Sequence, residues 1–347
     1  MSKLETTIKV LFILCIIWVY LVILAGGSVR ASGAGMGCPD WPLCFGQFIP
    51  PTSIDNLPSN WTEFLHGAGA INPEFNLFHT WTEYINRLFG ALLGLLTLSL
   101  SLFCFVVRRT HPVVFICAIG ALLAVCFNGW LGSRVVASDL RPVTVSLHML
   151  GAFVVQGFLI FGYTKLTKFK TQNLQKNFNP AINFLIIASL ICLILQIGMG
   201  IQIRESIDWV IKTTDNVDRG KLLTMVPWIY YVHRSFSWVI FALSFLIFYL
   251  YFSPHLYSNL NFYKQIKKLV VDNKNIKYSF IYLILVFSQM LIGGALNHLG
   301  FPLVAQPLHL LVANLLFGLL CWMLFDNSIQ SPKKVSVRTA QNKALII

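Results

Sequence analysis

Residues 112–133, PVVFICAIGALLAVCFNGWLGS, contain no charged side chain. An uninterrupted apolar run of this length is typical of a helix that crosses a lipid bilayer, which needs about 20 residues. Seven further long stretches are predominantly apolar: 8–25, 79–106, 142–163, 181–203, 228–252, 278–297 and 303–325. All are longer and more continuously apolar than the roughly ten-residue alternating segments of a membrane β-barrel. The sequence therefore predicts an all-α integral membrane protein with eight transmembrane helices.

The composition agrees with this class of protein. Of 347 residues, 56% are hydrophobic and 11% are charged, whereas a soluble domain carries about 25% charged residues. Lipid has to solvate most of the apolar surface. No clear small-residue cleavage site follows 8–25, so we interpret that stretch as a membrane span and not as a signal peptide. Gly26-Gly27 is interpreted as the end of its helix.

The net charge of +13 is concentrated in alternate loops. Lysine and arginine dominate between 107 and 111, between 164 and 180, between 253 and 277, and after 330, whereas the other loops balance bases with acids. The positive-inside rule then predicts a multi-pass protein with both termini in the cytoplasm. We expect a bacterial inner (plasma) membrane, because no Arg-rich, Ser-rich leader indicates an imported organellar precursor. The basic excess reflects this topology, and we expect a lipid bilayer and no nucleic acid as the environment.

The chain repeats itself. Three residues of the first half recur in the second half at a common offset of 161: Asn128, Gly132 and His148 return as Gln289, Gly293 and His309. Asn86-Arg87 recurs as His233-Arg234, and Gly26 to Arg30 has a weaker echo in Gly198, Gly200 and Arg204.

This repeat predicts two pseudo-symmetric four-helix bundles that enter the membrane in the same orientation, because each has an even number of spans. The N-terminal bundle would comprise 1–165, with a long outer loop at 26–78. The C-terminal bundle would comprise 166–330, followed by a cytoplasmic tail at 331–347.

Three histidines, His148, His233 and His309, lie inside apolar spans near their outer ends. Ionisable groups there are costly and usually functional, although a hydrogen bond to a neighbouring helix is the alternative. Zinc and di-iron centres favour carboxylates or thiolates, which the spans almost lack. Haem needs axial imidazoles, an apolar slot and cations for its propionates. We therefore predict His233 and His309 as ligands of one haem iron, with Arg234 near its propionates.

The equivalent pair in the first half is His148 and Asn86, and asparagine is a poor haem ligand. Glu83 lies one helical turn from Asn86, and His79 lies one further turn outward. The second half therefore looks like a permanent electron-transfer centre, and the first like a place where a substrate binds and a proton moves. A structural salt bridge between Glu83 and Arg87, four residues apart, is the alternative for Glu83 and is compatible with catalysis.

The outer loop contains Cys38 and Cys44 in the segment CPDWPLC. Two cysteines in an oxidising compartment can form a disulfide that staples the loop. They can equally form a redox-active pair, and the sequence leaves both interpretations open.

GGSVRASGAGMGCPDWPLCFGQFIPP at 26–51, TEYINRLFGALLG at 82–94 and the paired late histidines resemble the haem A synthase family. The resemblance implies eight helices in two pseudo-symmetric bundles, a haem b cofactor on His233 and His309, and haem O as the substrate in the N-terminal bundle. The implied reaction oxidises a ring methyl of haem O to the formyl group of haem A, with water as the oxygen source, for cytochrome oxidase assembly. The family's first loop also carries a cysteine pair.

The same resemblance implies haem O synthase and an electron-transfer protein as partners, and it allows a homo-oligomer. Glu83 would stabilise or deprotonate the reacting methyl group. Electrons would leave through the C-terminal haem or the cysteine pair. Arginines are the candidates for the propionates of the substrate haem: Arg30, Arg87 and Arg141.

One position departs from the family pattern Glu-x-x-His-Arg, because Asn86 stands where the histidine is expected. Either His148 alone ligates the substrate haem, or His79 reaches over it, or Asn86 assists. His79 is seven residues from Asn86, about 10.5 Å along a helix, so we expect a five-coordinate or weakly six-coordinate haem on His148.

Two other functions fit less well. A di-haem b-type electron-transfer protein without a substrate haem would need balanced ligand pairs, which Asn86 disfavours. A haem-independent transporter would place its polar residues at the middle of the membrane, whereas these histidines lie near the outer rim.

Overall fold

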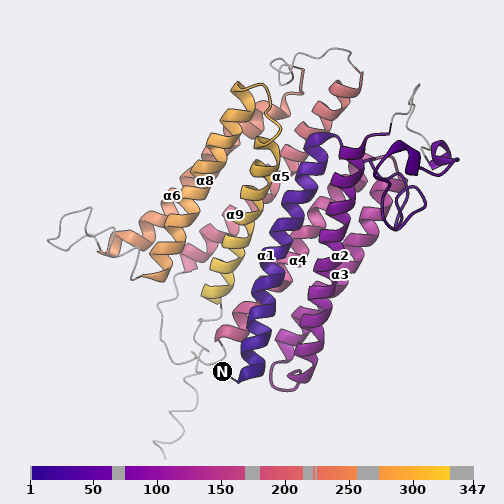
Figure 1. Ribbon diagram of the computed structural model, residues 1–347. Helices are drawn as coiled ribbons and strands as arrows, with labels where there is room; N and C mark the ends of the chain where they lie inside the picture. Colours follow the sequence, from indigo (N-terminus) through magenta and orange to yellow (C-terminus); the bar gives the residue numbers. More distant parts are fainter. Residues whose placement is uncertain are drawn as a thin grey trace, which may run out of the picture.

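The computed structural model describes residues 2–64, 75–168, 180–213, 222, 225–255 and 273–328. Eight of its helices are long and apolar enough to cross a membrane (Figure 1), which confirms the predicted fold class. They are α1 (Lys3–Ser32), α2 (Leu77–Val106), α3 (Pro112–Ala137), α4 (Pro142–Lys168), α5 (Pro180–Thr213), α6 (Ile229–Phe252), α8 (Lys274–His298) and α9 (Ala305–Ser328). No β-strand forms within these described ranges. The predicted tail at 331–347 lies outside them.

The helices contact one another as two rings of four. In the first ring α1 packs against α2 and α4, and α3 packs against the same two helices. In the second ring α5, α6, α8 and α9 repeat this order, and α9 also contacts α1 and α4. Figure 1 shows the two groups side by side, with the loop after α1 at the end opposite the N-terminus. We call that end outer, after the orientation that the charges predict. A domain boundary at 165 stays a proposal, since α4 runs on to Lys168.

The helices α1 and α5 extend furthest beyond their predicted C-terminal ends. The helix α1 does not stop at Gly26-Gly27 but continues to Ser32, where Gly33 adopts a left-handed φ of 74° and donates its N–H to the carbonyl of Arg30. Glycine is the usual residue at such a helix end. The helix α5 continues ten residues beyond 203, to Thr213. Hydropathy reports where lipid is contacted, but a helix can propagate into the polar layer, so the apolar run underestimates its length.

The apolar residues are shared between protein and lipid. Only 17% to 44% of the most apolar window in each span is buried within the protein. The remaining apolar side chains point outward, as a protein solvated by hydrocarbon requires. Each half nevertheless has its own buried cluster, around Leu100 and Leu159 in the first and around Ile186 and Leu316 in the second.

The contact between α4 and α9 shows the internal repeat directly. The rings of Phe153 and Phe317 are in tilted contact, with centroids 4.6 Å apart. Gln156 donates a hydrogen bond of 2.9 Å to the side chain of Asn314. The offset of 161 maps Phe153 onto Asn314 and Gln156 onto Phe317. Each half therefore supplies one ring and one amide to the boundary between the two rings of helices.

Candidate functional site

The imidazoles of His233 on α6 and His309 on α9 face each other in the second half. Their ring centroids are 6.5 Å apart and their planes are inclined by 56°. A transition metal bonds an imidazole nitrogen at about 2 Å, so two imidazoles on opposite sides of one metal ion have centroids roughly 6 Å apart. The observed spacing fits a single metal ion between the two rings.

His233 is oriented by the neighbouring helix α5. Its Nδ1 lies 3.1 Å from the main-chain oxygen of Gln196, and its Cε1 would be only 3.4 Å from a Cβ at Gly200. The side-chain amide of Gln196 donates in return to the carbonyl of His233, at 2.8 Å. With Nδ1 donating to a carbonyl, Nε2 carries the lone pair that a metal requires. The ring of His233 thus packs closely against Gly200.

His309 lies against α8 in the same manner. Its Cε1 would be 3.3 Å from a Cβ at Gly293, which again leaves room for the ring. Its Nδ1 is buried and makes no hydrogen bond to the described residues. The second half thus holds two imidazoles, each packed against a glycine of an adjacent helix.

The first half holds one such imidazole. His148 on α4 places Nδ1 3.0 Å from the main-chain oxygen of Asn128 on α3, and its Cε1 would be 3.3 Å from a Cβ at Gly132. On α2, Asn86 occupies the position that corresponds to His233. Its Oδ1 is buried without a hydrogen-bond partner among the described residues and would be 3.6 Å from a Cβ at Gly26.

Cys38 and Cys44, for which the sequence left two interpretations open, form a disulfide, and both residues are fully buried. Glu83 accepts a 3.0 Å hydrogen bond from the N–H of Cys38 and forms a 2.5 Å ion pair with Arg87. The guanidinium of Arg87 also donates 2.7 Å hydrogen bonds to three carbonyl groups of the loop: those of Cys38, Asp40 and Leu43.

Glu83 and Arg87 therefore hold the disulfide loop on α2. The salt bridge that was the structural alternative for Glu83 is present, and both carboxylate oxygens have a partner. Whether the same carboxylate also reacts with a substrate stays a proposal.

His79 lies in the first turn of α2 and is separated from the other histidines. Its ring contacts Phe78, with centroids 6.1 Å apart, and its carbonyl lies so close to Gly37 that a Cβ there would collide with it. The main chain of His79 thus supports the disulfide loop, two helical turns outward from Asn86.

The predicted propionate-binding arginines have different surroundings. Arg30 forms a 3.0 Å ion pair with Asp208 of α5, and Arg204 joins the same carboxylate at 2.8 Å. These contacts tie the two halves together at the outer end. In contrast, the side chains of Arg141 and Arg234 make no hydrogen bond or ion pair with the described residues, and both are exposed.

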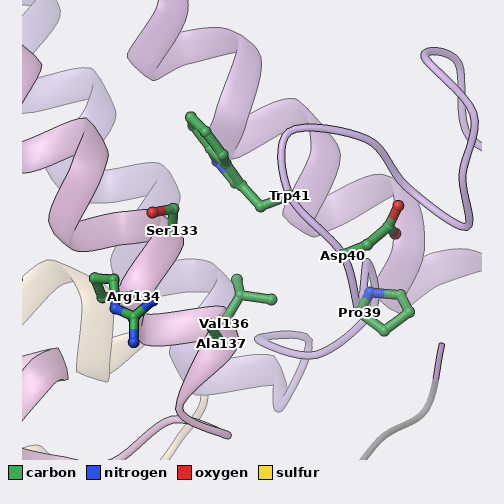
Figure 2. A pocket seen from close by; sticks show the side chains of 7 residues that line it. All are labelled: Pro39, Asp40, Trp41, Ser133, Arg134, Val136 and Ala137. Atoms are coloured by element: carbon green, nitrogen blue, oxygen red, sulfur yellow. The ribbon is translucent and has the colours of Figure 1, made fainter.

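A cleft at the outer end of the first half contains an arginine that the sequence analysis missed. The cleft has a volume of about 260 Å³ and lies between the disulfide loop and the end of α3 (Figure 2). Its lining comprises Pro39, Asp40, Trp41, Ser133, Arg134, Val136 and Ala137. Arg134 follows Gly132 by two residues, and its counterpart at the offset of 161 is Ala295. Arg134 could have been identified from the sequence, because a cation stands at this position in only one of the two repeats.

Comparison with known proteins decides the family. The model of the cytochrome oxidase assembly protein family (COX15-CtaA) matches residues 9–321, which include every helix that lines the two sites. The chain belongs to this family.

Among similar proteins, Heme A synthase of Shewanella oneidensis is 33% identical over 150 residues, which are 43% of each chain. Heme A synthase of Shouchella clausii is 25% identical over 51% of this chain and 50% of its own. The chain thus matches half or less of these two relatives. Heme A synthase of Listeria welshimeri is 23% identical over 91% of this chain and 94% of its own.

The anchoring of the loop yields a prediction for Arg87→Lys. Lysine keeps the charge but lacks the planar fork that reaches several acceptors. Losing even one charge-assisted hydrogen bond costs about 1.5–3 kcal/mol, so we expect dithiothreitol to reduce the Cys38–Cys44 bond at least about tenfold faster. Alkylation of the two thiols, followed by peptide mass spectrometry, measures the rate. Arg108→Lys at the opposite end is the matched control, and equal rates in both variants would contradict the anchoring role.

Proposed function

We propose that this protein oxidises haem O to haem A, converting a ring methyl group to a formyl group for cytochrome oxidase assembly. Family membership and the relatives named Heme A synthase support this activity. The observation that carries it is the chemical difference between the halves. One half pairs two imidazoles at a spacing that suits one iron, and the other has a single oriented imidazole, with asparagine at the position that corresponds to the second one.

His233 and His309 would hold the resident haem b, and their surroundings fit such a group. The 6.5 Å between their ring centroids suits one iron between the two imidazoles. A haem held there supplies one-electron transfer. Arg234, exposed and next to His233, would bind its propionates.

His148 would hold haem O in the first half. Arg134 in the outer cleft and Arg141 near the start of α4 are the free cations nearest to it in sequence and would bind the propionates. Arg30 and Arg87 fit this role less well than the sequence suggested, because each is engaged in several contacts. The cleft between the disulfide loop and α3 would admit the substrate.

The overall change at the methyl carbon removes four electrons and four protons and adds the oxygen of one water molecule. The electrons would pass to the second half and from there to a one-electron acceptor protein. Glu83 would accept a proton from the reacting group, since a buried carboxylate one turn from Asn86 is the nearest acid–base side chain on α2.

Haem O synthase would supply the substrate. The charge pattern supports cytoplasmic termini, and a bacterial plasma membrane and a homo-oligomer are compatible with these roles.

Replacing His148 tests where the substrate binds. We expect His148→Ala, produced with haem O synthase in a host without its own haem A, to lower the haem A content at least about tenfold, in line with the loss of a metal ligand's support. The haem b content should stay unchanged. Chromatography of extracted porphyrins measures both. His298→Ala, on the exposed end of α8, is the control, and a normal haem A content in His148→Ala would refute the assignment.

Replacing Glu83 separates its two roles. Glu83→Gln removes the charge but keeps a side-chain oxygen that can accept the N–H of Cys38. We expect unconverted or partly oxidised haem to accumulate, with haem A reduced at least about tenfold, as is typical for the loss of an acid–base group. The disulfide should be reduced more slowly than in Arg87→Lys. Should haem A fall only in proportion to the loosening of the disulfide, Glu83 would act through the loop alone.

A further inference from the structure

One arrangement of three residues occurs three times in the described helices. A residue with a side-chain amide is followed four positions later by a glycine, and the glycine lies against a histidine of the next helix. The three sets are Asn128, Gly132 and His148; Gln196, Gly200 and His233; and Gln289, Gly293 and His309. In each set the glycine leaves the ring Cε1 within 3.3–3.4 Å of where a Cβ would lie. We call each set an imidazole cradle.

The side-chain amides of the three cradles share a second property. One amide oxygen in each is buried and has no hydrogen-bond partner among the described residues: those of Asn128, Gln196 and Gln289. Buried polar atoms without partners are uncommon in native proteins. Because they recur at equivalent positions, we interpret the cradle as a repeated unit that orients an imidazole.

The fourth equivalent position, between α1 and α2, is an incomplete cradle. Gly26 is retained and faces Asn86, but asparagine replaces the histidine, and Val22 stands four residues before the glycine in place of an amide. This position therefore lacks both the histidine and the amide of a complete cradle, but it keeps the glycine and the space beside it. Asn86 fills less of that space than an imidazole would, and its buried Oδ1 is without a partner.

Among the described residues, no other histidine of the first half takes over this position. His79 lies two turns outward, in the first turn of α2, and its main chain supports Gly37 of the disulfide loop. Moving its ring toward Asn86 would require α2 to shift and would separate that contact. In the described part of the first half, one imidazole is therefore oriented by a cradle, and the position equivalent to the second one holds a short amide.

We infer that haem bound by His148 keeps one axial coordination position open on the side of Asn86, and that this position accepts a small ligand of the size of water or carbon monoxide. The amide of Asn86 can form a hydrogen bond with a polar ligand there. This inference rests on the proposed role of His148. The second half, with two complete cradles, offers no such position.

Carbon monoxide binding to the dithionite-reduced, purified protein tests the inference. We expect carbon monoxide to shift the optical spectrum of the first-half haem and to leave that of the second-half haem unchanged. Asn86→His restores the ring of the fourth cradle, and Val22→Gln combined with it restores the whole cradle. Both variants should lower the carbon monoxide-reactive fraction at least tenfold and give a six-coordinate low-spin spectrum.

Asn86→Ala is the matched control, because it removes the amide and adds no ligand. It should bind carbon monoxide like the parent protein, which separates an open position from misfolding. The absence of carbon monoxide binding in the parent protein, or unchanged binding in a haem-loaded Asn86→His variant, would overturn the inference.

The haem content of His148→Ala distinguishes this failure from failure of the proposed function. If His148→Ala loses one haem and the parent protein does not bind carbon monoxide, only the open position is refuted. If His148→Ala loses no haem, the assignment of His148 and the inference that rests on it are both refuted.

Discussion

A histidine inside an apolar helix bundle has two ring nitrogens to satisfy where no water is at hand. In this protein His148 and His233 meet the demand in the same way, by placing Nδ1 at a main-chain oxygen of a neighbouring helix. A helical carbonyl already accepts a bond from its own helix, but its second lone pair is available. The ring that approaches this carbonyl packs closely against a glycine in the next turn, Gly132 for His148 and Gly200 for His233. The free Nε2 is then oriented by the backbone of two helices.

The rest of the architecture keeps these orientations in place. Two rings of four helices bring the imidazoles of α6 and α9 together, while the corresponding positions of the first ring are held by Asn86 on α2 and His148 on α4. At the outer end Asp208 joins Arg30 of one half to Arg204 of the other. Because Arg87 and Glu83 bind the disulfide loop to α2, the loop covers the half that has the weaker ligand set. The two halves thus differ both in their candidate haem ligands and in whether the disulfide loop covers them.

Much of this was predictable from the sequence, because hydropathy and repeat spacing are properties of the chain itself. The eight spans, His148, His233 and His309 were found in this way, and so was the departure at Asn86. The extended ends of α1 and α5 were not, since polar residues carry no signal for whether a helix continues past the lipid. Gln196 escaped notice because an insertion between α5 and α6 changes its spacing from His233. The three carbonyl groups that bind Arg87 depend on a loop conformation that composition does not encode.

An experimental density map of the haem-loaded protein in a lipid nanodisc tests the central claim most directly. The account predicts one iron between the Nε2 atoms of His233 and His309, and a second iron bonded to His148 with no protein ligand on the side of Asn86. An iron bonded to only one of His233 and His309, or a first-half iron ligated by His79 or Asn86, would contradict it.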